Sequence, residues 1–241
     1  MIAALIGLTL ISCGPKLGSA DGRPMAHTPA TAGVSNPVLA ALLQDHWDAT
    51  LRRWPTWATQ LGDHRFDDKL EESGPDAWQA MREGLDYWIN KVEAIDSSGL
   101  NEQDQLTRDV LLSIFTGERD KSICFNEQWS LSPRTNAFSS LVRLPEDHPV
   151  DSVQDGNNLI ERYKAIPMVI ANDIANMRLG IEAGRVNTQE STRRTIELLT
   201  TALAKPESEW SLLSPTNKEH PQWSAAELDQ FRTTLTQVTK E

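Results

Sequence analysis

The polar residues of this chain that could support chemistry gather in the stretch 54–70, which contains the run DHRFDD at positions 63–68. Clustered carboxylate and imidazole groups can bind a divalent cation. The run does not follow the calcium-loop pattern, because no glycine and terminal glutamate follow at the required spacing. The structural alternative is that Asp63 and Asp68 cap helix ends and pair with Arg65 or nearby basic residues. The lack of a second histidine nearby in the sequence favours this alternative.

The rest of the sequence contains no recognisable catalytic motif. The five histidines stand far apart, so no helix presents two of them on one face, and no HExxH motif occurs. A zinc hydrolase needs about three protein ligands and a carboxylate base. The signatures of a serine nucleophile, a phosphate-binding loop and a dinucleotide-binding loop are also missing. We therefore predict no catalytic residue, no metal ligand and no cofactor in this chain.

The composition limits the classes of partner. The chain has 241 residues, of which 39% are hydrophobic, so it can form a sizeable core. Its formal net charge of −11 argues against nucleic acid as a partner, because phosphate binding needs clustered Lys and Arg. The doublets Arg52-Arg53 and Arg193-Arg194 are expected to lie on solvated helix faces. Most of the eight tryptophans, including Trp47, Trp78 and Trp88, are expected to pack between helices rather than line a ligand groove.

The N-terminus indicates export and lipid attachment. Residues 1–12 are apolar but too short to span a bilayer, and they fit the apolar core of a secretory signal peptide. The tetrapeptide Leu10-Ile11-Ser12-Cys13 resembles the lipobox of bacterial lipoproteins, in which the cysteine carries a diacylglyceryl group. We predict a signal peptide at 1–12, lipidation at Cys13 and a flexible tether at 13–35. The predicted location is the cell envelope, with the protein anchored to a bacterial membrane.

Two further observations bear on this prediction. No Lys or Arg precedes Cys13, so either the signal is atypical or the true start lies upstream. The alternative is a cytosolic protein with an apolar N-terminus. If Cys13 is lipidated, Cys124 has no intramolecular partner, and we predict no disulfide.

Hydrophobic periodicity predicts an all-α, irregular multi-helix domain over residues 36–241, because Val, Ile and Thr recur at helical spacings and not in alternation. The segment 124–144 is expected to form a loop with short helical pieces. Pro167 is expected to interrupt a helix and to begin or kink the next one. The last helix, 225–241, has no stop signal, which predicts that the domain is incomplete at its C-terminus. Other helix starts are predicted at Asn36-Pro37, Ser73-Gly74-Pro75, Asn101, Asp151 or Ser152, Asn187 and Ser224.

The stretch 54–70 also resembles a known family. Its "P-x-x-A-T-x-L-G-D-x-R-F-D-D-x-L" pattern is similar to the N-terminal signature of the bacterial family called domain of unknown function 885. Leu100 to Leu111 resembles that family's "L-x-x-x-D-x-L-x-x-D-x-L" helix, and the resemblance covers residues 36–215. The resemblance implies a conformational or cleft-lining role for the signature loop, which consists of Gly62, Asp63, His64, Arg65, Phe66, Asp67 and Asp68.

The resemblance implies a function that the chain itself does not display. The resemblance implies that family members are larger than this chain and helical, and that they are similar to zinc metallopeptidases of the gluzincin type, with the zinc motif in their C-terminal half. The chain would then be the N-terminal helical part of an exported, lipid-anchored hydrolase acting on a peptide substrate. Zinc would bind only to residues beyond Glu241. The alternative is a complete, non-catalytic envelope lipoprotein that serves as a binding or scaffold protein.

Overall fold

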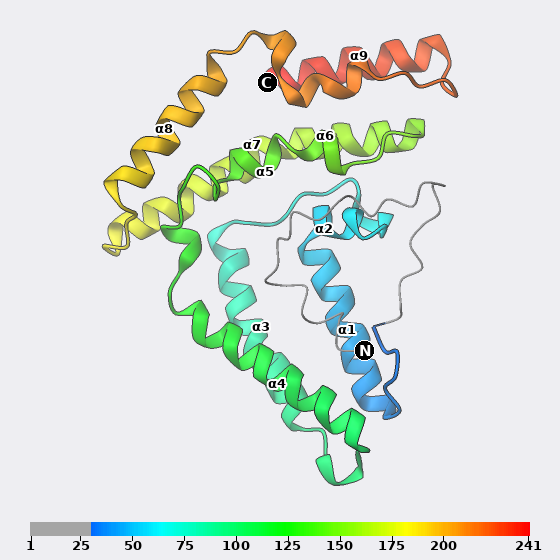
Figure 1. Ribbon diagram of the computed structural model, residues 1–241, viewed down its shortest axis with the longest axis vertical. Coiled ribbons are helices and arrows are strands. Elements are labelled where there is room, and N and C mark those ends of the chain that lie inside the picture. The colour runs from blue at the N-terminus through cyan, green and yellow to red at the C-terminus, as the bar shows by residue number, and fades with distance from the viewer. Residues whose placement is uncertain (1–29) are drawn as a thin grey trace. The chain divides into compact units, whose positions relative to one another are not determined.

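The computed structural model describes residues 30–241, and in this part of the chain the only regular secondary structure is helical. Nine α-helices and several short 3-10 turns make up the described residues (Figure 1). The all-α prediction is confirmed. The chain divides into two compact units: the first contains the described residues up to Leu51 together with 83–121, and the second contains 52–82 and 122–241.

The first unit is built from α1 (Pro37–Arg53), the C-terminal part of α3 (Pro75–Glu93) and α4 (Glu102–Ser122). Helix α1 begins as predicted: the side-chain oxygen of Asn36 accepts hydrogen bonds from the backbone N–H groups of Val38 and Leu39. Apolar side chains at helical spacing bury one face of each helix. The core of the unit consists of Leu39, Leu42, Leu43, Ile89, Val92, Ile95, Leu100, Leu111 and Phe115.

Asp104 fastens the beginning of α1 to the beginning of α4. Its carboxylate is buried and accepts hydrogen bonds from the backbone N–H groups of Ser35, at 3.0 Å, and Asn36, at 2.9 Å. The side chain of Asn101 caps α4 by accepting from the Asp104 N–H at 2.8 Å. Val34 packs against the same core. The last residues of the segment assigned to the tether therefore contact this helical unit.

The second unit contains α2 (Pro55–Gln60) and the helices that follow residue 122. Pro55 occupies the first turn of helix α2, where its missing N–H costs nothing. Two short helices, α5 (Ala137–Leu141) and α6 (Leu144–Asp147), interrupt the predicted loop at 124–144. These pieces confirm the irregular character expected of that segment.

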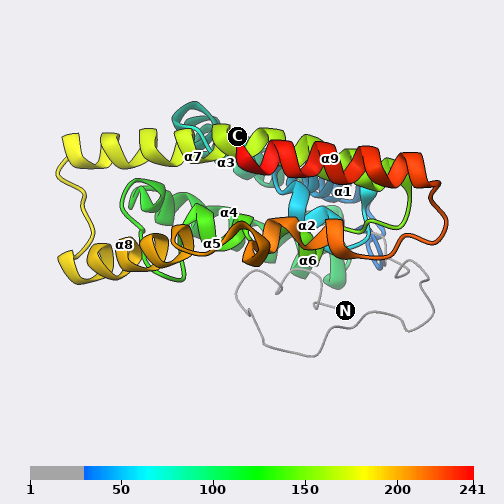
Figure 2. The ribbon, with the colours of Figure 1, turned by 90° about the horizontal axis from the view of Figure 1, so that it is seen from above.

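Helix α7 (Val153–Glu182) runs through Pro167 as one helix, so the prediction that Pro167 interrupts a helix and begins another is wrong. The proline removes one backbone hydrogen bond of the helix, whereas side-chain packing stabilises the helix along its whole length. The helix therefore continues through Pro167. Helix α9 (Ala225–Lys240) lies along α7 in both views (Figures 1 and 2). The core of this unit consists of Leu70, Leu141, Leu144, Val150, Leu159, Ile160, Tyr163, Phe231 and Leu235.

The predicted helix caps are largely present. Ser152 and Ser224 each form a capping box, with Asp155 and Glu227 as the returning carboxylates. Helix α8 (Gln189–Leu203) begins one residue later than predicted, because Thr188 and not Asn187 accepts the capping hydrogen bond. Ribbon views show α8 running apart from α7 (Figures 1 and 2).

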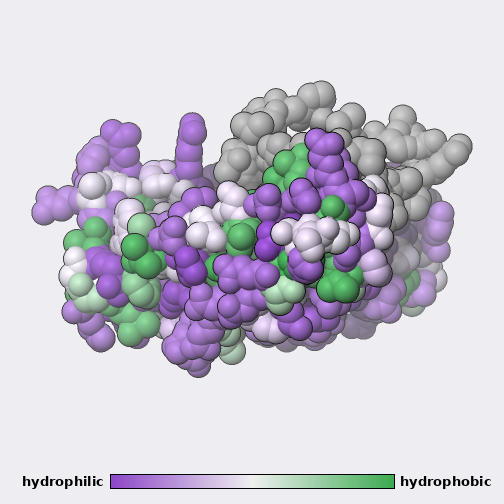
Figure 3. Space-filling view, turned by 90° about the horizontal axis from the view of Figure 1, so that it is seen from below, coloured by the Kyte–Doolittle hydropathy of each residue, from purple (hydrophilic) through white to green (hydrophobic). Residues whose placement is uncertain are grey.

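The surface agrees with the acidic composition. Hydrophilic side chains predominate on the face drawn in Figure 3, and smaller hydrophobic patches interrupt them. None of the helices within 30–241 combines the length and the apolarity needed to cross a bilayer. The predicted signal peptide, Cys13 and most of the tether lie outside the described residues.

Candidate functional site: a clasped arginine and a polar pocket

The signature loop joins α2 to the segment before α3. Gly62 adopts a left-handed backbone, with φ of 84°, which ends α2 and turns the chain. Asp63 then caps the 3-10 turn His64–Phe66 by accepting from the Arg65 N–H, and its carboxylate also forms an ion pair with the Arg65 guanidinium at 2.7 Å. The predicted capping and pairing by Asp63 is confirmed.

The second aspartate of the loop that contacts other side chains is Asp67 and not Asp68, which was expected to cap a helix end. Asp68 is exposed, whereas only 1% of Asp67 is exposed. The Asp67 carboxylate accepts a hydrogen bond from the Thr59 hydroxyl at 2.5 Å, and its other oxygen lies 2.7 Å from Nδ1 of His64. Asp67 is therefore a buried anion that needs a buried positive charge nearby.

That positive charge is Arg162 of α7, whose side chain is also 1% exposed. The Arg162 guanidinium lies 3.9 Å from the Asp67 carboxylate. Its Nη2 donates to the Thr59 hydroxyl at 2.7 Å, so the threonine bridges the two charges. Three further hydrogen bonds go to backbone carbonyl groups in and around the loop, which are those of Pro55, Phe66 and Lys69. The signature loop thus closes around one arginine.

His148 completes this arrangement. Its Nδ1 accepts a hydrogen bond from Nη1 of Arg162 at 2.8 Å, and its Nε2 lies 2.9 Å from the backbone oxygen of Asp155. Because an arginine can only donate, Nδ1 carries no proton and Nε2 donates to the carbonyl. Burial lowers the pKa of His148, and the neighbouring Arg162 lowers it further, against the opposing effect of the Asp155 carbonyl. The neutral imidazole therefore suits this position.

Every nitrogen of the Arg162 guanidinium is occupied by protein acceptors, and the group is inaccessible to solvent. The clasp formed by the signature loop and Arg162 is consequently a structural element. Sequence reasoning identified the loop but missed Arg162, Thr59 and His148. One signal was available, because Arg162 interrupts a row of apolar positions that includes Ile160 and Tyr163.

The environment of Arg53 differs from the solvated helix face that was expected for the doublet Arg52-Arg53. Its guanidinium carbon lies 5.1 Å from the ring centres of both Trp54 and Trp78, and its Nε and Nη1 are buried without a hydrogen-bond partner among the described residues. Burial lowers the pKa of Arg53, while Glu72 and Glu71 oppose that effect. The doublet at 52–53 therefore does not lie on a fully solvated face. Its counterpart at 193–194 does, since both arginines are exposed and pair with Glu190.

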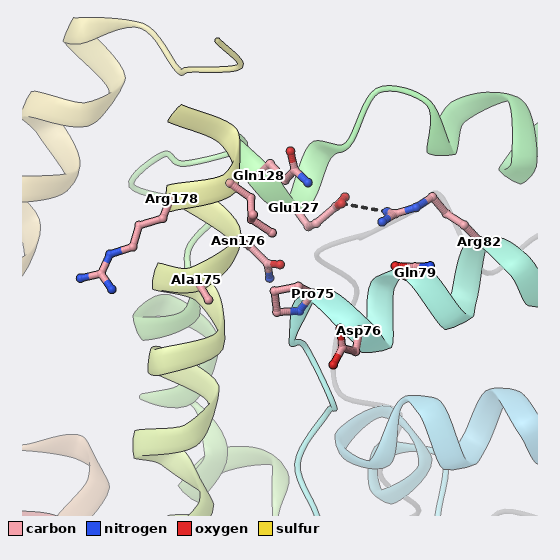
Figure 4. A pocket seen from close by; sticks show the side chains of 10 residues that line it. Pro75, Asp76, Gln79, Arg82, Glu127, Gln128, Ala175, Asn176 and Arg178 are labelled. Atoms are coloured by element: carbon pink, nitrogen blue, oxygen red, sulfur yellow. Dashed lines mark hydrogen bonds and ion pairs between the residues drawn. The ribbon is translucent and has the colours of Figure 1, made fainter. Parts of the chain in front are cut away.

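A polar pocket of about 610 Å³ lies beside the first turns of α3 (Figure 4). Its other walls are the 3-10 turn η3 (Asn126–Gln128) and the second half of α7. Glu127 forms an ion pair with Arg82 at 2.9 Å, and both side chains are largely buried. Sequence reasoning did not find this pocket, because its walls are far apart in the chain.

The turn η3 is held firmly against α7. Gly180 of α7 lies so close that a Cβ atom there would be 2.2 Å from the backbone oxygen of Gln128. The side chain of Gln128 accepts from Arg185 Nε at 2.8 Å. Phe125 has a left-handed backbone with φ of 47°, and its ring contacts the guanidinium groups of both Arg82 and Arg185. These contacts fix the position of Glu127 at the pocket wall.

Asn176 provides the most buried polar group of the pocket wall. Only 1% of the residue is exposed, and its Nδ2 donates to the backbone oxygen of Ser73 at 2.7 Å. That bond fixes the orientation of the amide, because a carbonyl can only accept. Oδ1 of Asn176 therefore remains as an acceptor. Nearby, the Ser73 hydroxyl is buried without a hydrogen-bond partner among the described residues.

Within residues 30–241, no group of three or more His, Cys, Asp or Glu side chains is placed to hold a metal ion. The signature loop brings His64 and Asp67 together, but a third ligand is not supplied there. Cys124 is an exposed, free thiol.

The fold and the clasp together define a helical domain organised around a buried arginine and its loop. A family model described as "Bacterial protein of unknown function (DUF885)" matches residues 55–241, and the chain belongs to this family. The match begins at the first residue of α2 and includes the entire signature loop and α7. None of the curated proteins matches the chain.

Two histidines with lowered pKa values, the partly buried His46 and the buried His148, predict acid sensitivity. Burial against Trp88 and Phe115 lowers the pKa of His46 to about 4, and His148 is shifted in the same direction. Below about pH 6.5 the unfolded chain binds protons that the folded chain excludes, so stability is complete above that pH and declines toward pH 4. For His46 alone, we expect a loss of about 2–3 kcal/mol at pH 4. Urea titrations between pH 7.5 and 4 measure this decline.

The variant His46→Gln provides the comparison. It should be less stable at neutral pH because a polar amide replaces the packed ring, but its stability should decline less between pH 6.5 and 4. An identical decline in the variant and the natural protein would show that His46 titrates normally in the folded state.

Proposed function

We propose that this chain is the N-terminal helical part of an exported, lipid-anchored, metallopeptidase-like hydrolase. The observation that supports this proposal is the pattern of exposed apolar side chains in the second unit. Ile174 and Ile181 are seven residues apart on α7 and are 41% and 67% exposed. Ile196 and Leu203 have the same spacing on α8 and are 58% and 80% exposed. A seven-residue spacing places each pair on one helix face.

Such faces are typical of helices that pack against additional polypeptide. In the proposed protein, the residues after Glu241 cover them and supply the zinc ligands and the catalytic base. Zinc would activate a water molecule for attack on an amide carbonyl. The contribution of the present chain is a rigid wall, because the clasp around Arg162 fixes α2, the signature loop and α7 to one another.

The decisive experiment begins with the coding sequence that follows the codon for Glu241. We expect an in-frame continuation containing HExxH. The extended protein should bind zinc and cleave peptides, and a chelator should abolish the cleavage. A stop codon directly after Glu241, or an extended protein without zinc and peptidase activity, would contradict the proposal and favour the non-catalytic scaffold protein. Attachment of the anchor is tested separately by labelling with a radioactive fatty acid, which Cys13→Ser should abolish.

A further inference from the structure

We infer that a row of apolar residues along the second half of α7 is the docking face for one amphipathic helix that runs alongside α7. The row consists of Ile170, Ile174, Met177 and Ile181, and it is called the α7 row. The docked helix belongs to the polypeptide that follows Glu241 in the proposed hydrolase, so its source rests on the proposed function. That function leaves open which kind of element covers α7, and the packing of α9 supplies the answer.

The first half of α7 shows how this helix accepts a neighbour. Helix α9 packs along it, and the two helices contribute to one hydrophobic core. Gly156 makes room for this contact, because a Cβ atom there would lie 2.7 Å from the Trp223 ring and 3.1 Å from the Phe231 ring. Tyr163, seven residues further along α7, is 1% exposed and belongs to the same core as Phe231 and Leu235. Positions of α7 at seven-residue spacing therefore face α9.

The α7 row continues this line of positions. Ile170 and Met177 follow Tyr163 at intervals of seven residues, and the other two members of the row each stand four residues further along. These spacings place the row on the helix face that α9 covers in the first half. Exposure rises along the row, since Ile170 is partly buried against the core whereas Ile174 is 41% and Ile181 67% exposed. The contact face thus extends beyond the neighbour that occupies its beginning.

The direction of the docked helix follows from α9. Both α7 and α9 run the same way in Figures 1 and 2, and the last turn of α9 lies beside the middle of α7. A helix in line with α9 therefore lies along the α7 row. The row from Ile170 to Ile181 is about 16 Å long, which corresponds to about three helical turns. A partner helix with apolar residues at alternating spacings of three and four presents a continuous stripe over this length.

Two other occupants match the α7 row less well. A second copy of the chain would contribute the same few side chains, which is a small contact compared with the roughly 800 Å² that each partner buries in a stable complex. A helix on the same chain does not need so large an area, because the linkage raises its effective concentration to about the millimolar range. An anionic lipid surface attracts clustered basic residues, but Arg178 beside the row is accompanied by Glu182.

The test uses the full 241-residue chain with isotope-labelled isoleucine methyl groups. The probe is a model peptide of about three heptads, with leucine at the two apolar positions of each heptad and glutamate, lysine and alanine elsewhere. The methyl signals of Ile174 and Ile181 should shift saturably, with a Kd of about 1 mM or tighter. The signal of Ile123, which is 74% exposed outside the row, should stay in place.

A second peptide of the same composition, with its leucines placed so that they share no helix face, is the control probe. It should bind at least about tenfold more weakly than the first. Equal binding of the two peptides would overturn the inference. The absence of a saturable shift at Ile174 and Ile181 would do the same.

Variants locate the docking face. Ile174→Ser replaces a partly exposed side chain, so the fold should be retained while the affinity for the model peptide falls about tenfold. Ile123→Ser is the matched control and should bind as the natural protein does. Equal affinities of the two variants would show that the peptide binds elsewhere.

The same variant tests the two other occupants. Self-association of the 241-residue chain that Ile174→Ser abolishes would assign the row to a second copy. Binding to phosphatidylglycerol vesicles that Ile174→Ser abolishes would assign it to a lipid surface. Either result would overturn the docked helix.

The extended protein separates the docked helix from the proposed function. In that protein the row should be covered, so the methyl signals of Ile174 and Ile181 should no longer respond to the model peptide. If zinc and peptidase activity are present but these signals still respond, the docked helix is wrong and the proposed function stands. If no continuation exists and the peptide binds the 241-residue chain, the proposed function and this source of the helix fail together, while the row remains a helix-docking face.

Discussion

Replacing Arg162 with methionine is expected to lower the free energy of unfolding by about 3–5 kcal/mol. The methionine fills part of the space but cannot donate hydrogen bonds. Asp67 would then remain as a buried carboxylate without its cation, and the carbonyl groups of Pro55 and Lys69 would each lose the hydrogen bond from Arg162. Urea unfolding followed by far-ultraviolet circular dichroism measures the change, with the slope of the transition as a check on two-state behaviour.

The matched control is Arg193→Met. Arg193 also pairs with carboxylates, those of Glu190 and Glu197, but it lies on the exposed face of α8. Exposed ion pairs contribute little, so the unfolding midpoint should stay close to that of the natural protein. If the two variants are equally stable, the clasp around Arg162 does not hold the second unit together.

Replacing Gly180 with alanine should also be strongly destabilising, by about 2–3 kcal/mol or more. The added Cβ would meet the backbone oxygen of Gln128 at 2.2 Å and that of Arg185 at 2.9 Å. Backbone atoms cannot move aside as a flexible side chain can, so η3 must separate from α7. Thermal or urea unfolding measures the loss.

The variant Gly117→Ala is expected to be more stable than the natural protein, in contrast to Gly180→Ala. Gly117 is in the middle of α4, and an added Cβ there would meet nothing within 4 Å. Alanine is the better helix former, so this variant should be more stable by up to about 1 kcal/mol. Should Gly180→Ala be stabilised in the same way, the close approach of η3 to α7 would be wrong.

Local signals in the sequence were sufficient to predict where most of the helices begin. Asn36, Ser152 and Ser224 cap the helices that they were predicted to cap, because a side-chain cap depends only on residues within one turn. Pro167 misled the prediction, since a local helix-breaking residue was outweighed by packing along α7. The cap of α8 was predicted at Asn187, but Thr188 is the capping residue. Both residue types are common caps, and no local feature of the sequence distinguishes between them.

The site was predictable only in part, for a different reason. The composition of the signature loop was visible, but the role of Asp67 depends on Arg162, which is almost a hundred residues away. The pocket likewise joins Asp76, Glu127 and Asn176, which no spacing in a single sequence connects. Partners of this kind become apparent only when the chain is folded.

The long span of the clasp also determines when it can form. The hydrogen bonds from Arg162 reach Lys69 and Pro55 across 93 and 107 residues. During synthesis the signature loop leaves the ribosome long before its arginine does, and closing so long a segment carries a large entropic cost. The helices before residue 122 can make their own contacts earlier. The most recognisable segment of the family is therefore expected to reach its native conformation late in folding.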